Sequence, residues 1–587
     1  MPGEVGLDIS GFASLGTNIF LPSRTTTMRP EVADNVTLIR GHHSIRFGFY
    51  ALVRGNHTQS NTFFPGRFEF GALPGGILSP CLQVPAACGL AASVTAATIN
   101  PLQAVSLGLP QFYQQGFGNP TYNFTRPFLA GYGQDTWQIR PNLTFTYGLR
   151  YEVDAQSGAM PTDKDNFAPR VSFAWDPFKD SKTVIRGGYG IYYAPIYAQI
   201  PDVVQTLGNI NGVRQIANIL VPLTGVPGSP ALTSAAIFQT LFAQGKVQCT
   251  VPTAGNAACI TPADLTQFGI NITNSGPLPP LTVIFGVQKN YQSPYSQQGS
   301  FGIERAIISS LSVSASYIYV HTSRLPVAID ANLLPAPIVG GIRNWAAPSC
   351  TANPFSCFVN PLITQNNVYS SIASALYQGG ILEVKERFNP HISLIANYTY
   401  SKATDNTTDF NSDYAPFDQT NINGDRGLSE FDQRHKVVIA SILTSPWKPW
   451  YFSDFELSPI FRYNTGHPFN LLAGSDVNGD RHFTNDRPIG IGRDTGLGPN
   501  YYTFDLRFSR NIRFRDHYNI QLMAEAFNLT NRTNYASVNN IVGASYTGPA
   551  HPHGFVATAA VTPGGTPLAF TSDYAKREIQ LGARFAF

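Results

Sequence analysis

The stretch SDVNGDRHFTNDRP carries the residue types of a cation site. Asp476, Asn478 and Asp480 stand at alternate positions, as the first three ligands of a calcium loop do, so a structural calcium ion is the one cofactor that the sequence suggests. The pattern then fails, because Arg481 and Arg487 occupy positions where such a loop needs a glycine and a bidentate glutamate. A polar loop turn is therefore the favoured interpretation.

A second stretch, DRGLSEFDQRHK, concentrates acidic and basic side chains. They are Asp425, Arg426, Glu430, Asp432, Arg434 and His435. Catalysis would need an acid, a base and a nucleophile that converge on one pocket, and this stretch holds no nucleophile with an oriented base. We interpret these residues as paired charges at the end of a strand, and we expect the protein not to be an enzyme.

The glycine-rich run Gly187–Gly190, GGYG, could suggest a phosphate loop. It lies inside an alternating segment, with no following helix and no GK[ST] sequence, so phosphate binding is not supported. Glycines at such a place allow a strand to bend or another segment to approach closely.

Six cysteines occur as three close pairs: Cys81 with Cys88, Cys249 with Cys259, and Cys350 with Cys357. The spacings suit small disulfide-closed loops in an oxidising compartment. A zinc site is less well supported, because no CxxC spacing is present and histidines do not accompany the pairs. We therefore predict three loop disulfides.

The elements that must carry these loops are β-strands with one apolar and one polar face. Leu143, Phe145 and Tyr147 alternate with Thr144 and Thr146, and the same period of two recurs along the chain. Many of these segments exceed the five or six residues usual for soluble strands. The expected strands are 34–40, 44–54, 127–139, 142–153, 168–176, 182–193, 296–306, 310–322, 376–388, 391–403, 432–444, 451–464, 500–513, 518–530 and 576–587.

Short and long links alternate between these strands. The long links are 55–126, 194–295, 323–375, 465–499 and 531–575, and each cysteine pair falls inside one of them. We expect these links to be structureless, and connections far above about 12–15 residues are uncommon in compact soluble domains. Short turns on one side and long loops on the other are typical of outer-membrane barrels.

The composition supports a membrane barrel. Charged residues make up 13% of the chain, about half of the usual roughly 25%, while aromatic residues reach 12%. The mean hydropathy of -0.07 and the absence of a run of about 18 apolar residues exclude a helical membrane protein. A closed barrel is the other way to satisfy the backbone in lipid. The net charge of +3 gives no reason to expect a nucleic-acid partner.

The expected strands number roughly 15, with boundaries good to a few residues. Bacterial barrels close with an even number of strands, and the first residues carry no recognisable signal peptide. We therefore expect the chain to be the later part of a longer protein, with residues 1–33 an irregular loop or the remainder of an upstream strand.

Several segments together resemble the TonB-dependent outer-membrane receptors, specifically their Oar-like branch found in Acidobacteria. They are DNVTLIRGHHSIRFGFY, GYGQDTWQIRPNLTFTYGLRYE, NFAPRVSFAWDPFKDSKTVIRGGYGIYY, SPYSQQGSFGIER, DRGLSEFDQRHKVVIAS, EAFNLTNRTNY and the terminal LGARFAF. The resemblance implies an antiparallel transmembrane barrel of about 22 strands with a plug in its lumen. This chain would hold about 15–16 of those strands and no plug.

The resemblance also implies partners. These are outer-membrane lipid and lipopolysaccharide, the barrel-assembly machinery, the TonB system acting through the plug that this chain lacks, and a bulky ligand of unknown identity. Phe587, the terminal residue of an alternating last strand, resembles the aromatic signal that the assembly machinery recognises.

The sequence thus predicts a single all-β barrel domain over residues 1–587, located in the bacterial outer membrane. Its expected function is energy-dependent movement of a bulky ligand across that membrane. A passive porin or an adhesin-like barrel is the alternative within the same fold. A secreted soluble β-protein, such as a carbohydrate-active enzyme, is the third class, and it would fold without detergent or lipid.

Overall fold

A computed structural model describes most of the chain. The described residues are 4–21, 23–74, 98–209, 214–225, 231–249, 258–273, 278–389, 391–447, 449, 453–482, 484–514, 518–556 and 566–587. Among them, no helix is long and apolar enough to cross a membrane.

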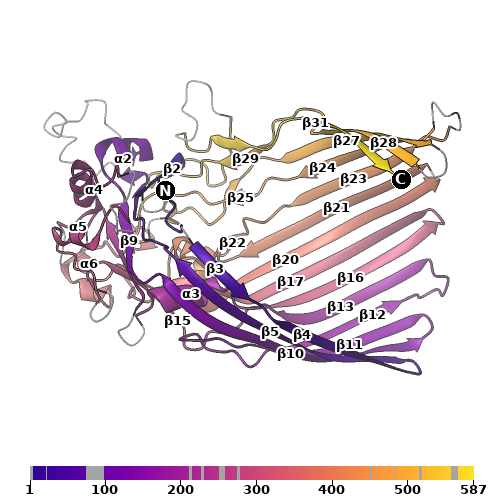
Figure 1. The fold of residues 1–587 in the computed structure, drawn as a ribbon, viewed down its shortest axis with the longest axis horizontal. Helices are drawn as coiled ribbons and strands as arrows, with labels where there is room; N and C mark the ends of the chain where they lie inside the picture. The colour runs from indigo at the N-terminus through magenta and orange to yellow at the C-terminus, as the bar shows by residue number, and fades with distance from the viewer. Residues whose placement is uncertain are drawn as a thin grey trace.

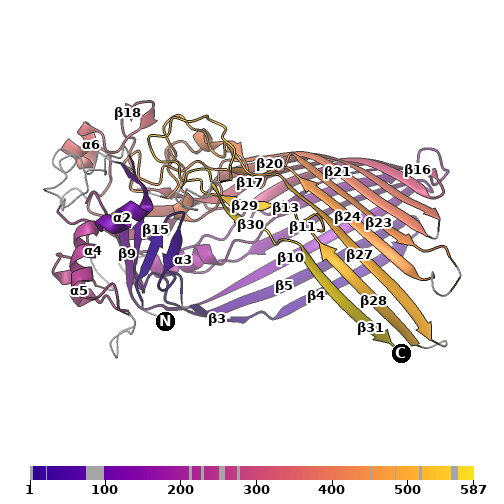
Figure 2. The ribbon, with the colours of Figure 1, turned by 90° about the horizontal axis from the view of Figure 1, so that it is seen from above.

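One long antiparallel sheet forms a curved wall, and Figures 1 and 2 show its strands side by side. Each wall strand pairs with the next along the chain, and each expected strand range overlaps one of them. In order they are β4 (Glu31–Arg40), β5 (His43–Ser60), β10 (Thr121–Arg140), β11 (Leu143–Asp154), β12 (Phe167–Trp175), β13 (Thr183–Tyr193), β16 (Tyr295–Ile308), β17 (Leu311–Asp330), β20 (Gln365–Asn389), β21 (Ile392–Asp405), β23 (His435–Thr444), β24 (Phe455–Asn464), β27 (Tyr501–Phe514), β28 (Tyr518–Phe527) and β31 (Glu578–Ala586).

The wall exposes large apolar side chains in cross-strand rows. Phe301 faces Tyr317 in the β16–β17 register, and their exposed fractions are 49% and 46%. Neighbouring rows repeat the pattern with Tyr147, Leu149 and Leu382. A soluble protein rarely leaves so much connected apolar surface in water, whereas lipid covers it without cost. The apolar rows therefore fit a face that contacts the membrane.

The sheet of the wall has, at each of its two edges, a strand that pairs on one side only. Only β5 pairs with β4, and only β28 pairs with β31, in the part of the chain that the structure describes. Every residue of both end strands is exposed. In the described structure β31 and β4 therefore keep unpaired edges and do not close on each other.

Of the two expectations for residues 1–33, an irregular loop or the remainder of an upstream strand, the described part of the segment does not fit an irregular loop, and the second stays a prediction. The described part contains β1 (Gly6–Ile9), β2 (Ala13–Leu15), β3 (Ser23–Met28) and the start of β4. The strand β3 pairs with the outer half of β5, and β1 pairs in parallel with β6 (Arg67–Phe70). Backbone partners supplied by distant segments give order that the local pattern did not indicate.

The long links are also not structureless, because they fold into a cap at one end of the wall. The cap sheet runs β2, β1, β6, β9 (Phe112–Gly118), β14 (Ile216–Pro222), β15 (Thr282–Val287) and the first residues of β20. Among the described residues its helices are α2 (Pro101–Leu107), α3 (Gln199–Leu207), α4 (Ser234–Ala243), α5 (Pro262–Thr266) and α6 (Pro348–Ala352). Figure 1 shows the cap at the left and the short turns at the right.

The last strand gives a test of which face meets lipid. Gln580 donates to Glu525 on β28 at 2.9 Å, while Phe585 stacks on Tyr518 with ring centroids 5.9 Å apart. The two faces of β31 are thus polar and apolar. With cysteine placed singly at 580, 581, 584 and 585 in the membrane-inserted protein, we expect a bulky aqueous thiol reagent to label 580 and 584 and to spare 581 and 585. The reverse pattern would contradict the assignment.

Candidate functional site

The cap sheet has an apolar core on each face. On one face, α2, α4 and α5 pack on β6, β9 and β14 through a cluster that includes Phe68, Tyr113 and Ile237. On the other face, α3 packs through Ile200 and Val204 on β14 and β15. Adjacent residues of one strand supply opposite cores, as the period of two requires. The cap is therefore a folded layered unit.

A cavity of about 260 Å³ lies on the α3 face of the cap sheet. Side chains from β3, from the wall strands β5 and β10, from β6, β9, β14, β15 and β20, and from α3 line it. The lining residues outside these elements are Phe20, Thr62, Phe63, Asn411, Ser412, Asp413, His482 and Thr484. Residues from nearly the whole length of the chain thus meet around one space, which sits where the wall joins the cap.

Besides its two tyrosines, the described cavity lining contains four acidic or basic side chains, Arg67, Asp202, Asp413 and His482. The Arg67 guanidinium bonds to Gln114 at 3.0 and 3.1 Å and lies 3.7 Å from Asp8. Burial raises the pKa of Asp202 to about 7, although nearby Arg126 and Tyr122 oppose the shift. A carboxyl that titrates near neutral pH beside aromatic rings is typical of a binding site.

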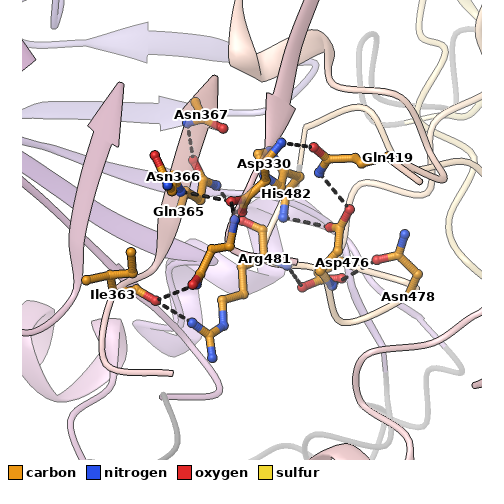
Figure 3. Close-up of polar contacts among 12 residues, drawn as sticks. Asp330, Ile363, Gln365, Asn366, Asn367, Gln419, Asp476, Asn478, Arg481 and His482 are labelled. Carbon is orange, nitrogen blue, oxygen red and sulfur yellow. Dashed lines mark hydrogen bonds and ion pairs between the residues drawn. The ribbon is translucent and has the colours of Figure 1, made fainter. Parts of the chain in front are cut away.

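The link 465–499 enters the cap as a buried polar turn, which Figure 3 shows in part. Asp476 accepts from Gly479 N at 2.6 Å and from Arg481 N at 2.9 Å, and Asn478 accepts from Asp480 N at 2.9 Å. Gly479 has φ +78, and a Cβ there would lie 2.5 Å from the backbone nitrogen of Ala346. The turn therefore needs glycine in its centre.

His482 joins this turn to the wall. Its Nε2 lies 3.3 Å from Asp330 Oδ2 at the end of β17, and both side chains are almost fully buried (Figure 3). Burial alone would lower the pKa of His482, but the hydrogen bond to Asp330 and the charges of Asp480 and Asp476 raise it to about 9. The imidazole is therefore a cation at neutral pH.

Arg481 extends the same connection to β20. Its Nη1 donates to the carbonyl of Ile363 at 2.6 Å, and its carbonyl accepts from Gln365 at 2.6 Å. Asp480 accepts from Gln419 at 3.1 Å, which ties in the link that follows β21. This polar turn, residues 475–487, therefore fixes three distant links against one another beside the cavity.

The calcium prediction gains no direct evidence from this geometry. The side-chain oxygens of Asp476, Asn478 and Asp480 accept hydrogen bonds from the turn itself or from Gln419. Within the described residues, no group of three His, Cys, Asp or Glu side chains is arranged to hold a metal ion. These hydrogen bonds account for the polar turn, and calcium binding stays an untested prediction.

The charged stretch from Asp425 to Lys436 forms pairs at the rim of the wall. Asp425 accepts from Arg487 at 2.6 Å, and Asp432 lies 3.2 Å from Arg434. His435 stacks on Tyr398 with ring centroids 6.1 Å apart. The interpretation as paired charges at the end of a strand fits these contacts.

The glycine run lies within β13, as the alternation indicated. A Cβ at Gly187 would lie 2.5 Å from the Phe173 ring on β12, so glycine there admits a cross-strand aromatic side chain. The last residue, Phe587, is 92% exposed and lies at the end of the wall where the short turns are (Figure 1). Its role as an assembly signal stays a prediction.

Two of the three expected disulfides lie among the described residues, both in the cap. Cys249–Cys259 and Cys350–Cys357 are bonded, with Cα–Cα distances of 6.0 and 5.4 Å. Cys81 and Cys88 lie outside the described residues.

We expect mass spectrometry of non-reduced peptides to find all three neighbouring pairs, including Cys81–Cys88. After reduction, each of these disulfide-linked peptide pairs should separate into its two peptides, and no linked pair should contain cysteines from two different links. Free thiols at all six positions, or bonds between different links, would contradict this prediction.

The cavity residues were not found from the sequence. The lining is contributed by single side chains of many links, and no local motif contains Arg67, Asp202 and His482 together. The one signal that could have indicated a folded cap is the strongly apolar run of β14 and α4, IANILVP and SAAIFQTLFA. Such runs are unusual in solvated loops.

Comparison with known proteins gives the class. A family model described as "Outer membrane beta barrel domain" matches residues 2–157, 154–492 and 489–550, and the chain belongs to this family. It is a protein of the bacterial outer membrane. A search of curated proteins found no significant match.

Solved structures of outer-membrane transporters align with the chain at low identity. The outer membrane transporter YddB from Escherichia coli is 10% identical, with 100% of this chain and 58% of that chain covered and a TM-score of 0.49. The FrpB iron transporter from Neisseria meningitidis is 11% identical, with 89% of this chain and 54% of that chain covered and a TM-score of 0.44. The ferripyoverdine receptor of Pseudomonas aeruginosa is 10% identical, with 96% of this chain and 48% of that chain covered and a TM-score of 0.45. The chain thus spans about half the length of these structures.

Proposed function

We propose that this chain is the barrel portion of a TonB-dependent receptor of the Oar-like branch, and that it moves a bulky ligand across the outer membrane with energy from the inner membrane. The supporting observation is the folded cap with a cavity where the cap joins the wall. Long loops lie on the outer side of such barrels, so the cap faces the medium. It is the first part of the protein that a ligand meets.

The open edges support a larger barrel. Backbone groups of β4 and β31 that stay unpaired in lipid would each cost several kcal/mol. We propose that further strands, encoded upstream, lie between these edges and bring the barrel to about 22 strands. The same upstream part would hold the plug through which the TonB system acts, and Phe587 would direct insertion by the barrel-assembly machinery into a membrane of lipid and lipopolysaccharide.

We propose no catalytic role. The acidic side chains of the charged stretch, such as Asp425 and Asp432, are taken up in ion pairs with Arg487 and Arg434. A catalytic acid or base instead needs access to a substrate proton.

Conductance measurements distinguish the transporter from a passive porin. The full-length gene product, purified from outer membranes, is inserted into a planar bilayer. A receptor closed by a plug should give no stable stepwise channels, because its lumen opens only under energy input. Ohmic channels in every insertion would favour the porin and contradict the proposal.

A further inference from the structure

The cavity beneath the cap allows an inference about the ligand, and this inference rests on the proposed transport function. Its volume of about 260 Å³ lies just below the roughly 300–1,000 Å³ of typical small-molecule pockets. A bulky ligand cannot enter whole. The cavity therefore accepts one ring-sized terminal unit while the remainder of the ligand stays outside.

Aromatic rings supply the apolar part of the lining. They are Phe20, Phe63, Phe112, Tyr122, Phe285 and Tyr369. Phe20 and Phe63 meet edge to face, and Phe285 stacks on Tyr369, each pair with ring centroids 6.0 Å apart. Rings held in this way present flat apolar surfaces of fixed orientation. A ligand unit with a flat C–H face fits against them.

Hydroxyl and amide side chains supply most of the polar part. Several of them already bond within the protein, as Thr25 does with Thr58 and Gln114 with Arg67, and keep further donor or acceptor capacity. The set is Ser23, Thr25, Thr58, Ser60, Thr62, Gln114, Gln199, Thr206, Gln365, Asn411, Ser412 and Thr484. Such groups both donate and accept hydrogen bonds without carrying charge. They match a ligand unit that carries several hydroxyl groups around its edge.

The charges argue against an anionic ligand. The cationic side chains among the described lining residues are Arg67 and His482, and each already lies beside a carboxylate, Asp8 and Asp330 respectively. In contrast, Asp202 Oδ1 is buried and has no hydrogen-bond partner among the described residues. A buried acceptor without a donor costs about 1–3 kcal/mol. Asp202 belongs to the cavity lining, so a small rotation of its side chain would bring this oxygen to a ligand hydroxyl and recover that cost.

We propose that the cavity binds a pyranose ring at the end of an oligosaccharide, with its C–H face on the aromatic rings and one hydroxyl donating to Asp202. A pyranose is the common ring-sized unit that combines a flat C–H face with hydroxyl groups on its rim. The oligosaccharide comes either from polysaccharides in the medium or from the lipopolysaccharide of the cell's own surface, because both present the same chemistry.

Binding of the labelled full-length protein in detergent to a glycan array tests this proposal. One part of the array carries oligosaccharides of plant and microbial polysaccharides, and another carries lipopolysaccharide core and O-antigen oligosaccharides. We expect binding within one part, which also identifies the source. An array without bound glycans would overturn the proposal.

Two variants connect binding to the cavity. Asp202→Leu removes the acceptor at similar size, and Thr25→Trp fills the cavity from the exposed strand β3, so one of them remains informative if the other fails to fold. We expect each to weaken glycan binding at least tenfold. Thr351→Trp, on α6 outside the lining, is the matched control and should bind as the unmodified protein does.

Equal binding by both cavity variants would place the glycan elsewhere and overturn the assignment. In a second control, spermidine is added at the same concentration at which the glycan saturates the protein. If spermidine displaced the glycan, the cavity would take an amine, and this result would also overturn the assignment. The inference and the proposed function fail separately. If no glycan binds but transport depends on energy, only the proposed ligand class is wrong. If a glycan binds but transport does not depend on energy, only the proposed transport mechanism is wrong.

Discussion

Replacing Arg493 by alanine should destabilise the cap by about 3–5 kcal/mol, because two buried carboxylates lose their cation. The Arg493 side chain is 2% exposed. It donates to Asp405 Oδ1 on β21 and to Thr408 Oγ1 at 3.0 Å, and it lies 3.1 Å from Asp494 Oδ2 as an ion pair. The truncation leaves buried negative charge without compensation. We expect the link 465–499 to become cleavable by protease at a temperature where the unmodified protein resists.

A matched control is Lys576→Ala. Lys576 lies 2.5 Å from Asp573, but the side chains are 51% and 42% exposed, so water and salt screen the pair. Its loss should cost less than about 1 kcal/mol. Equal effects of the two substitutions would show that the Arg493 contacts do not hold the cap together.

The second large effect concerns pH. Burial raises the pKa of Glu69, Asp202 and Asp494 to about 7, and contacts with Asp330, Asp480 and Asp476 raise that of His482 to about 9. These groups therefore hold more protons in the folded cap than in the unfolded chain between about pH 4 and pH 9. Stability falls with rising pH wherever the folded state binds more protons.

For the carboxyl groups, the loss begins at their unfolded values near pH 4 and ends near pH 7. For His482, the stabilisation is complete below about pH 6.5 and disappears as the pH rises through about 9. We expect the midpoint of cap unfolding, followed by protease cleavage within residues 465–499, to be at least about 5 °C lower at pH 9 than at pH 5.

The variant His482→Gln isolates one part of this effect, because glutamine does not titrate. It should flatten the change between pH 7 and pH 9 and leave the change between pH 5 and pH 7. A midpoint that rises from pH 5 to pH 9 in the unmodified protein would contradict the prediction.

The strands of the wall could be predicted from the sequence because each carries its own evidence. In β11, the alternation that puts Leu143, Phe145 and Tyr147 on one face can be recognised from this segment alone, and the same holds for β31. The strand ends were less accurate. β20 begins at Gln365 instead of near 376, since its first residues pair with β15 and β17 beyond the expected strand.

The cap and its cavity depend on contacts that no local pattern encodes. The strand β1 is ordered by β6, far along the chain, and His482 faces Asp330, which is 152 residues away. Even the turn around Gly479 resembles a calcium loop in sequence, while in the structure its side-chain oxygens accept from nearby N–H groups. Chain order alone could not indicate which loops share one space.

The central claim is energy-dependent transport, and solute uptake by cells tests it most directly. Cells with and without the full-length gene are grown in a complex medium, with and without an uncoupler of the inner membrane, and solutes lost from the medium are measured by mass spectrometry. The account predicts a bulky solute that only gene-bearing cells remove and whose removal stops when the uncoupler is added. Removal that continues at the same rate in uncoupled cells would contradict the account and assign the protein to the passive porins.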